Sequence, residues 1–122
     1  MNRMAALAAL PLLLVACGGG DKGGSSVSTT GSPEAQTATV DMNDKLAFEP
    51  STVNAKVGTV TLDVVNVGVV PHNLEFDDKA LGKTSTVDGK KDEKLKVTFD
   101  KAGTFTFVCT FHPGMTGKVV VS

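Results

Sequence analysis

A short segment near the C-terminus combines three side chains that can bind a metal ion. Cys109, His112 and Met115 lie in the run CTFHPGM and offer a thiolate, an imidazole and a thioether. The only other histidine of the chain, His72, lies upstream in VPHNL and could supply a second imidazole from a neighbouring loop. Two histidines and one cysteine in a plane, with a weak axial methionine, form a donor set that suits copper in electron transfer. The pattern therefore predicts one copper ion bound by His72, Cys109, His112 and Met115.

Zinc is the main alternative for a site with two histidines and one cysteine. A structural zinc site normally has four strong nitrogen or sulfur ligands, and a catalytic zinc site keeps one position open for water. A thioether is a poor ligand for zinc and a good ligand for copper, and the general order of metal affinity also favours Cu(II) over Zn(II). The donor set therefore favours copper that cycles between Cu(I) and Cu(II).

Each of these side chains also has an ordinary structural explanation when it is considered alone. A lone cysteine is usually an inert, small hydrophobic residue, and a methionine usually fills a gap in a core. Either histidine could simply lie on the surface. Metal binding explains the combination better, because the chain after residue 37 has one cysteine and two histidines, and all three occur where one ion could bind them.

The N-terminus predicts where such a site would work. Arg3 precedes an apolar run, residues 4–15, that is too short for a membrane span, since a spanning helix needs about 20 residues. The run ends in LVAC, which resembles the lipobox of bacterial lipoproteins and makes Cys17 the lipid attachment residue. An ordinary signal peptide with a chance cysteine is the alternative. We predict a signal peptide over residues 1–16 and an extracytoplasmic lipoprotein, anchored at the periplasmic face or the cell surface.

Composition divides the rest of the chain into two parts. Residues 17–37 are rich in glycine, serine and threonine, with few apolar side chains, which predicts a flexible linker. Residues 38–122 have the size of a single domain. With 12 basic and 13 acidic residues, the chain lacks the basic excess that is typical of nucleic-acid binding. We therefore expect no nucleic-acid partner.

Alternating apolar residues predict β-strands at residues 59–64, 94–99, 104–109 and 117–121. Phe105, Phe107 and Cys109 share one face of their strand, so the thiol should face the interior. The alternation changes phase over residues 65–67, which predicts a bulge or the end of the strand just before the His72 loop. With turn residues between the strands, these patterns predict an all-β fold, a small antiparallel Greek-key β-sandwich.

The segment from residue 48 to residue 122 resembles the cupredoxins of the plastocyanin and amicyanin type. The matching motifs are FEPST from residue 48, Asn66 ahead of PHN, and CTFHPGMTGKVVV from residue 109. The Cys-x2-His-x2-Met spacing is that of the short ligand loop of amicyanin. The resemblance implies a type 1 (blue) copper site in which His72, Cys109, His112 and Met115 are the ligands.

Two further residues take a role from this resemblance. Asn73 corresponds to a position that ties the two ligand loops together by hydrogen bonds. Phe111 stands where amicyanin has a proline, which cannot donate a backbone hydrogen bond. An N–H bond from Phe111 to the thiolate would weaken the donation of sulfur to copper and raise the reduction potential.

Three functions compete for such a protein. The first is an electron carrier that uses the exposed edge of His112 and acts as a monomer between a redox donor and an acceptor, neither of which the sequence identifies. The alternative is copper buffering or delivery, but after the signal peptide the chain has only Met42 beyond Met115 and no spare histidine. A copper enzyme would need further histidines for a second copper site, so we expect no enzymatic activity.

Overall fold

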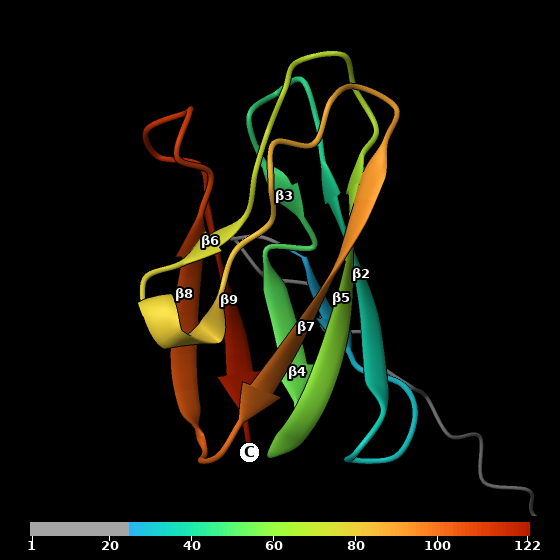
Figure 1. The fold of residues 1–122 in the computed structure, drawn as a ribbon, viewed down its shortest axis with the longest axis vertical. Helices are drawn as coiled ribbons and strands as arrows, with labels where there is room; N and C mark the ends of the chain where they lie inside the picture. The colour runs from blue at the N-terminus through green and yellow to red at the C-terminus, as the bar shows by residue number, and fades with distance from the viewer. Residues whose placement is uncertain (1–24) are drawn as a thin grey trace, which may run out of the picture.

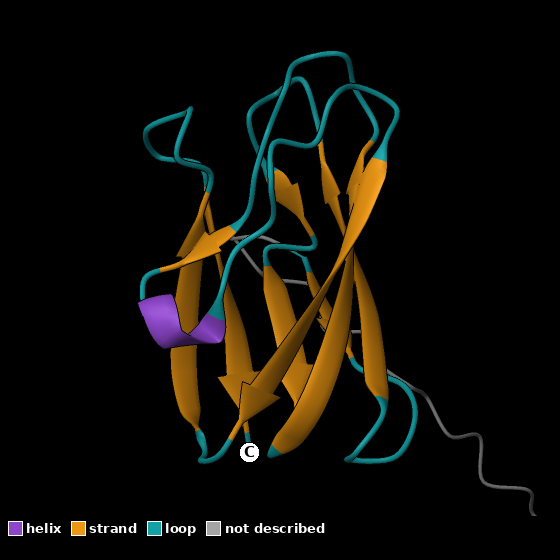
Figure 2. Ribbon diagram, in the orientation of Figure 1, coloured by secondary structure: helices purple, strands orange, loops and turns teal. Residues whose placement is uncertain are grey.

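The computed structural model describes residues 25–122, which form two β-sheets packed face to face and one short helix (Figures 1 and 2). The strands are β1 (Ser26–Ser28), β2 (Gln36–Met42), β3 (Phe48–Glu49), β4 (Thr52–Ala55), β5 (Gly58–Asn66), β6 (Glu75–Phe76), β7 (Asp92–Phe99), β8 (Gly103–Val108) and β9 (Thr116–Val121), and the 3-10 helix η1 is Lys79–Leu81. Among these residues, no helix is long and apolar enough to cross a membrane. The predicted signal peptide, Cys17 and the first part of the predicted linker lie outside the described residues.

One sheet has the strand order β1-β4-β9-β8-β6 and the other has the order β3-β2-β5-β7. The four predicted strands correspond to β5, β7, β8 and β9, and the predicted all-β sandwich is confirmed. The sheets are mixed and not antiparallel throughout, because β2–β5, β4–β9 and β1–β4 are parallel pairs. Between the two strands of each parallel pair, the chain passes through at least one strand of the opposite sheet. The second strand can therefore run in the same direction as the first.

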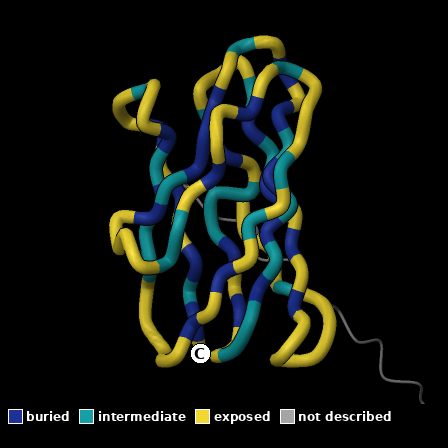
Figure 3. Tube along the Cα trace, in the orientation of Figure 1, coloured by how far each residue is buried: buried dark blue, intermediate teal, exposed yellow. Residues whose placement is uncertain are grey.

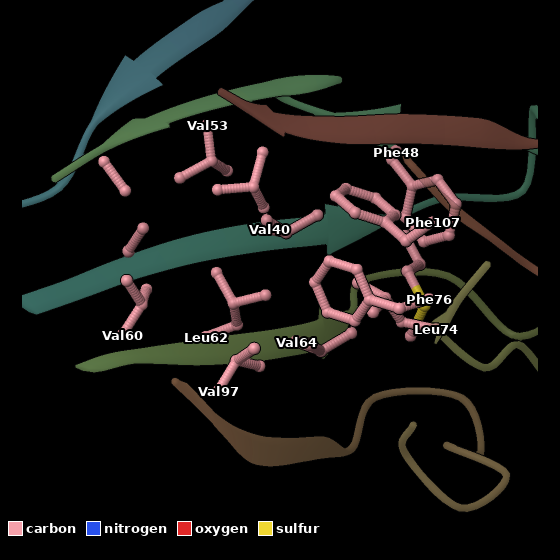
Figure 4. Close-up of a cluster of buried hydrophobic side chains, with 14 of the residues drawn as sticks. Val40, Phe48, Val53, Val60, Leu62, Val64, Leu74, Phe76, Val97 and Phe107 are labelled. Atoms are coloured by element: carbon pink, nitrogen blue, oxygen red, sulfur yellow. The ribbon is translucent and has the colours of Figure 1, made fainter. Parts of the chain in front are cut away.

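The inner faces of the two sheets form a single core. Its aromatic side chains pack edge to face, and the ring centroids of Phe48 and Phe107 lie 4.9 Å apart (Figure 4). Phe107 and Cys109 are buried and Phe105 packs partly buried against the core, in agreement with the predicted face of β8. Burial of these large rings favours a rigid platform directly below the loop that follows β8.

β5 ends at Asn66, in agreement with the strand end predicted near residues 65–67. The change in the apolar pattern has a different cause from the predicted bulge. Buried positions alternate without interruption along β5, and the last of them is Asn66. Its side chain accepts a hydrogen bond from the N–H of Gly68 and donates to the carbonyls of Val70 and Val87. A polar residue that is fully hydrogen-bonded can occupy such an inward position.

The domain begins before the predicted boundary at residue 38. β1 pairs with β4, and β2 already starts at Gln36, whose side chain is buried. The Gln36 amide exchanges two hydrogen bonds of 2.8 Å with the backbone of Lys56 and accepts a third from the Thr29 hydroxyl. The linker prediction for residues 25–37 is therefore corrected. Strand pairing uses backbone groups, so a segment with few apolar side chains can still join a sheet.

The loops that carry the predicted ligands gather at one end of the sandwich, opposite the C-terminus (Figure 1). The loop between β8 and β9 lies beside the long connection between β5 and β6 and the loop between β2 and β3. Exposed positions are concentrated in such loops, and buried positions follow the inner faces of the strands (Figure 3). The β-sandwich thus provides a rigid base for a group of exposed loops.

Candidate metal centre

The structure brings His72, Cys109 and His112 together from two loops. One potential ligand atom from each residue lies within 4.8 Å of the others. The Cys109 Sγ and His72 Nδ1 atoms are 3.8 Å apart, and the imidazole rings of His72 and His112 have centroids 4.9 Å apart. Metal bonds to nitrogen and sulfur are about 2.0–2.3 Å long, so one ion placed between these atoms could contact all three.

A compact turn after β8 positions three of the predicted ligands. The N–H of Cys109 donates to the carbonyl of Met115 (3.0 Å), and the N–H of Met115 donates to the carbonyl of His112 (3.1 Å). Gly114 allows this turn because its φ of 86° lies in the left-handed region, which side chains other than glycine rarely adopt. The turn returns the chain so that Met115, which is 2% exposed, is buried at the start of β9 next to Cys109.

Three hydrogen bonds to two partners hold His72 in place. Its backbone exchanges hydrogen bonds with Val87, and its Nε2–H donates to the carbonyl of Asn43 at 2.9 Å. Because Nε2 carries the hydrogen in that bond, Nδ1 is left with a free lone pair directed toward Cys109. Burial lowers the pKa of His72, and the nearby His112 lowers it further. A neutral imidazole is the form that binds metals.

His112 differs from His72 in its exposure. It is half-buried, and its Nε2–H donates to the carbonyl of Pro71 at 3.2 Å. Exposed apolar side chains lie in the neighbouring loops, with Val69 at 69% and Phe111 at 49% exposure. The edge of the site that reaches solvent is therefore the imidazole of His112, in an apolar surrounding.

Asn73 connects the two ligand loops. Its Oδ1 accepts a hydrogen bond from the N–H of Thr110 (2.8 Å), and its Nδ2 donates to the Thr110 hydroxyl (2.9 Å). These bonds join the connection between β5 and β6 to the loop after β8. The hydrogen bond from the N–H of Phe111 to the thiolate stays a prediction, and Cys17 lies outside the described residues.

Two supporting residues were missed in the sequence. Asn43 contributes its backbone carbonyl to His72, and Asp44 accepts hydrogen bonds from the N–H groups of Val69 (2.9 Å) and Val70 (3.1 Å). The bonds from Val70 and Val69 lower the pKa of the Asp44 carboxyl group. An Asn-Asp pair in a loop indicates a turn, but nothing local indicates that this turn contacts residues 69–72.

An all-β sandwich with sulfur and imidazole donors gathered at one end defines a class of small metal-binding domains. The chain belongs to the family of cupredoxin-like domains, whose sequence pattern it matches over residues 7–121. The predicted copper cofactor is confirmed by this membership together with the donor set that the structure brings together.

Individual relatives agree with this assignment. The chain is 38% identical over 79 residues to an amicyanin of Paracoccus denitrificans, covering 63% of this chain and 60% of the relative. It is 33% identical over 86 residues to a plastocyanin of Scenedesmus fuscus, covering 62% and 87% of the two chains. The solved structure of a reduced Cu(I) form of an amicyanin variant superposes with a TM-score of 0.54 at 36% identity, covering 69% of this chain and 80% of that one. The chain therefore spans about 60% of the length of the amicyanin that it matches.

Proposed function

We propose that this protein is a blue copper electron carrier in which His72, Cys109, His112 and Met115 hold one copper ion. The observation that carries the proposal is the convergence of three potential ligand atoms within 4.8 Å of one another. A thiolate and a thioether suit Cu(I), and imidazole binds both oxidation states, so this set favours one-electron exchange. When bound, copper would accept and release a single electron.

The residues around the ligands keep them in place. The carbonyl of Asn43 orients His72, the Asn73–Thr110 pair fixes the distance between the two loops, and the turn from Cys109 to Met115 closes on itself. Supporting hydrogen bonds of this kind orient metal ligands and tune the metal. Donors that are held by the protein move little when the ion changes its oxidation state, which lowers the cost of electron transfer.

Electrons would enter and leave through His112. Its imidazole is the candidate ligand that reaches the surface, and the two loops that carry the ligands expose the apolar side chains of Val69 and Phe111. Exposed apolar groups of this kind typically mark a contact surface for another protein. The partners are a redox donor and a redox acceptor, with the carrier acting as a monomer between them.

The proposal includes a membrane anchor. The LVAC sequence supports lipid attachment at Cys17 after removal of residues 1–16. Several acyl chains give stable anchoring where a single chain does not. The carrier would then work at the periplasmic face or at the cell surface, with a linker that begins at residue 17 and ends where β1 begins.

Burial favours an electron carrier over the alternative, a lipoprotein for copper buffering or delivery. His72, Cys109 and Met115 are at most 3% exposed, so they are poorly accessible to a competing metal-binding partner. Delivery proteins need exposed ligands that exchange. Both histidines of the chain belong to this one site, which leaves none for a second copper centre of an enzyme.

The visible spectrum of the copper-loaded protein tests the proposal. A short bond between Cu(II) and the Cys109 thiolate should give an intense absorption band, which disappears on reduction. Cys109→Ser should abolish the band, and Cys17→Ser, in protein expressed without its signal peptide, is the matched control that should keep it. A protein that binds Cu(II) and stays colourless would contradict the assignment. Slow loss of copper to a strong Cu(I) chelator, together with fast electron self-exchange, would further separate a carrier from a delivery protein.

A further inference from the structure

The chain enters the folded domain close to the candidate metal centre. The carbonyl of Ser25 accepts a hydrogen bond from the N–H of Thr52 at 3.1 Å, and β1 then runs parallel to β4, away from that end. A hollow of about 680 Å³ beside the ligand loop is lined by Ser25 together with Phe48, Gly114 and Met115. The first residue that the structure describes thus shares a surface depression with a proposed ligand.

Without β1, the chain would enter at the opposite end of the sandwich. β2 starts at Gln36 and runs toward the loop that contains Asn43. The turn before β2 is attached to the far end, because the N–H of Thr59 donates to the carbonyl of Pro33 at 3.0 Å. The C-terminal residue Ser122 lies at that same end, where its carbonyl accepts the N–H of Val57. β1 therefore places the point of attachment at the start of β4, beside the hollow that Met115 lines, and not at that far end.

Specific contacts hold β1 in this position. At the end of the strand, the N–H of Thr29 donates to the carbonyl of Asn54 at 2.9 Å, and the Thr29 hydroxyl donates to the buried amide of Gln36. At its start, the bond between Ser25 and Thr52 completes the pairing. The segment is polar, but it is bound at both ends, so it is part of the domain.

This placement shortens the tether to the proposed anchor. Ser25 lies eight positions after Cys17, with seven residues between them, and a fully extended chain over that interval spans at most about 28 Å. A free linker that continued to residue 37 would reach about 70 Å. The copper end of the sandwich, and not its far end, is attached to this short tether.

We infer that β1 fixes the anchored chain to the copper end of the sandwich, so that the copper centre serves a redox partner embedded in the same membrane. The inference rests on the lipid anchor at Cys17 that the proposed function includes. A centre held within a few tens of ångströms of the bilayer meets membrane-embedded partners at a high effective concentration, which falls steeply as the tether lengthens.

Two insertions of the same twelve Gly/Ser residues test this inference in the full-length lipoprotein. The first lies between Gly24 and Ser25, before β1, and lengthens the tether. The second lies between Gly31 and Ser32, in the exposed turn after β1, and lengthens the chain without lengthening the tether. Each copper-loaded protein is bound to vesicles that contain a lipid with a ferrocene headgroup. The ferrocene passes one electron to Cu(II), giving ferrocenium and Cu(I), and the loss of the blue absorption reports the rate.

The insertion before β1 should slow this reduction about fourfold, because effective concentration falls roughly as the −3/2 power of the tether length. The insertion after β1 should leave the rate unchanged. Reduction by soluble ferrocyanide should be equal in all the proteins, which confirms an intact copper site. As a further variant, Thr29→Pro removes the N–H that binds Asn54 and should release β1, so it should also slow reduction by the lipid probe.

Equal slowing by the two insertions would show that β1 does not hold the chain, and would overturn the inference. No slowing by the insertion before β1 would overturn it as well. A colourless protein, or one that does not float with the vesicles, would overturn the proposed function and this inference with it. If the protein is blue and bound to vesicles, but the two insertions do not change the reduction rate as expected, the inference alone would be overturned.

Discussion

Asn73 and Thr110 join the two loops that carry the proposed copper ligands, through hydrogen bonds of 2.8 Å and 2.9 Å. Each residue directly follows a ligand, His72 in one loop and Cys109 in the other. Because Asn73 is buried, water cannot readily replace these bonds. The pair therefore sets the separation between the imidazole and the thiolate before any metal binds.

Replacing Asn73 by alanine should destabilise the metal-free protein by about 1–3 kcal/mol, because it leaves the N–H of Thr110 without its partner. Copper binding should persist, since all four ligands remain. Urea unfolding measures the change in the free energy of unfolding. Asn54→Ala, at an exposed asparagine in β4, is the control and should lower the free energy of unfolding clearly less. Equal losses of stability in the two variants would mean that the hydrogen bonds between the loops contribute little.

Met115→Leu should preserve copper binding and raise the reduction potential. The axial sulfur of Met115 is a weak donor that stabilises Cu(II) relative to Cu(I), so its removal should favour the reduced ion. The three ligands of the trigonal plane remain. Redox titration and metal analysis check both parts. The matched control is Met42→Leu, since Met42 is equally buried but lies in β2, and the potential should not change there. Complete loss of copper in Met115→Leu would instead indicate that Met115 is a primary ligand in another geometry.

Asp44 should make the metal-free protein sensitive to acid. Hydrogen bonds from Val70 and Val69 lower its pKa below the ordinary value of 3.8. A carboxyl group with a lowered pKa in the folded state contributes stability above its unfolded pKa and loses it as the pH falls through the folded value. The difference in stability between the wild type and Asp44→Asn should therefore narrow below about pH 4.

Urea unfolding of the metal-free protein at several pH values measures this difference. Asp100→Asn, at an exposed aspartate just after β7, controls for the loss of one surface charge. A difference for Asp44→Asn that stays constant from neutral to acidic pH would contradict the assigned role of the carboxylate.

Truncation tests the corrected boundary of the domain. A protein that starts at Ala38 loses β1 and Gln36, and leaves the backbone N–H of Lys56 without its acceptor. It should be less stable than a protein that starts at Ser25 by about 1–3 kcal/mol, as measured by urea unfolding. The copper spectrum should not change, because all four proposed ligands remain in the shorter protein. Gln36→Ala in the longer protein should reproduce part of the loss. Equal stability of the proteins that start at Ala38 and at Ser25 would support the predicted domain boundary at residue 38.

The sequence by itself determined the donor set and four of the strands, β5, β7, β8 and β9. Cys109, His112 and Met115 are close in the chain, so their convergence needs only one turn, and the alternation along β5, β7 and β8 is a local property of each segment. Asn66 shows the limit of such patterns, because its polar side chain interrupts the apolar alternation although the position is buried. A local sequence pattern shows that a residue is polar, but it does not show which distant groups form hydrogen bonds with its side chain.

Only the tertiary structure decided which distant groups support the site. The carbonyl of Asn43 that orients His72 is a backbone atom, which every residue possesses, so no residue type indicates it. The parallel pairings β2–β5 and β4–β9 depend on how the chain crosses between the sheets. β1 has a polar sequence that is typical of a linker, and it joins the sheet through backbone hydrogen bonds to β4 that form only when that strand is already in place.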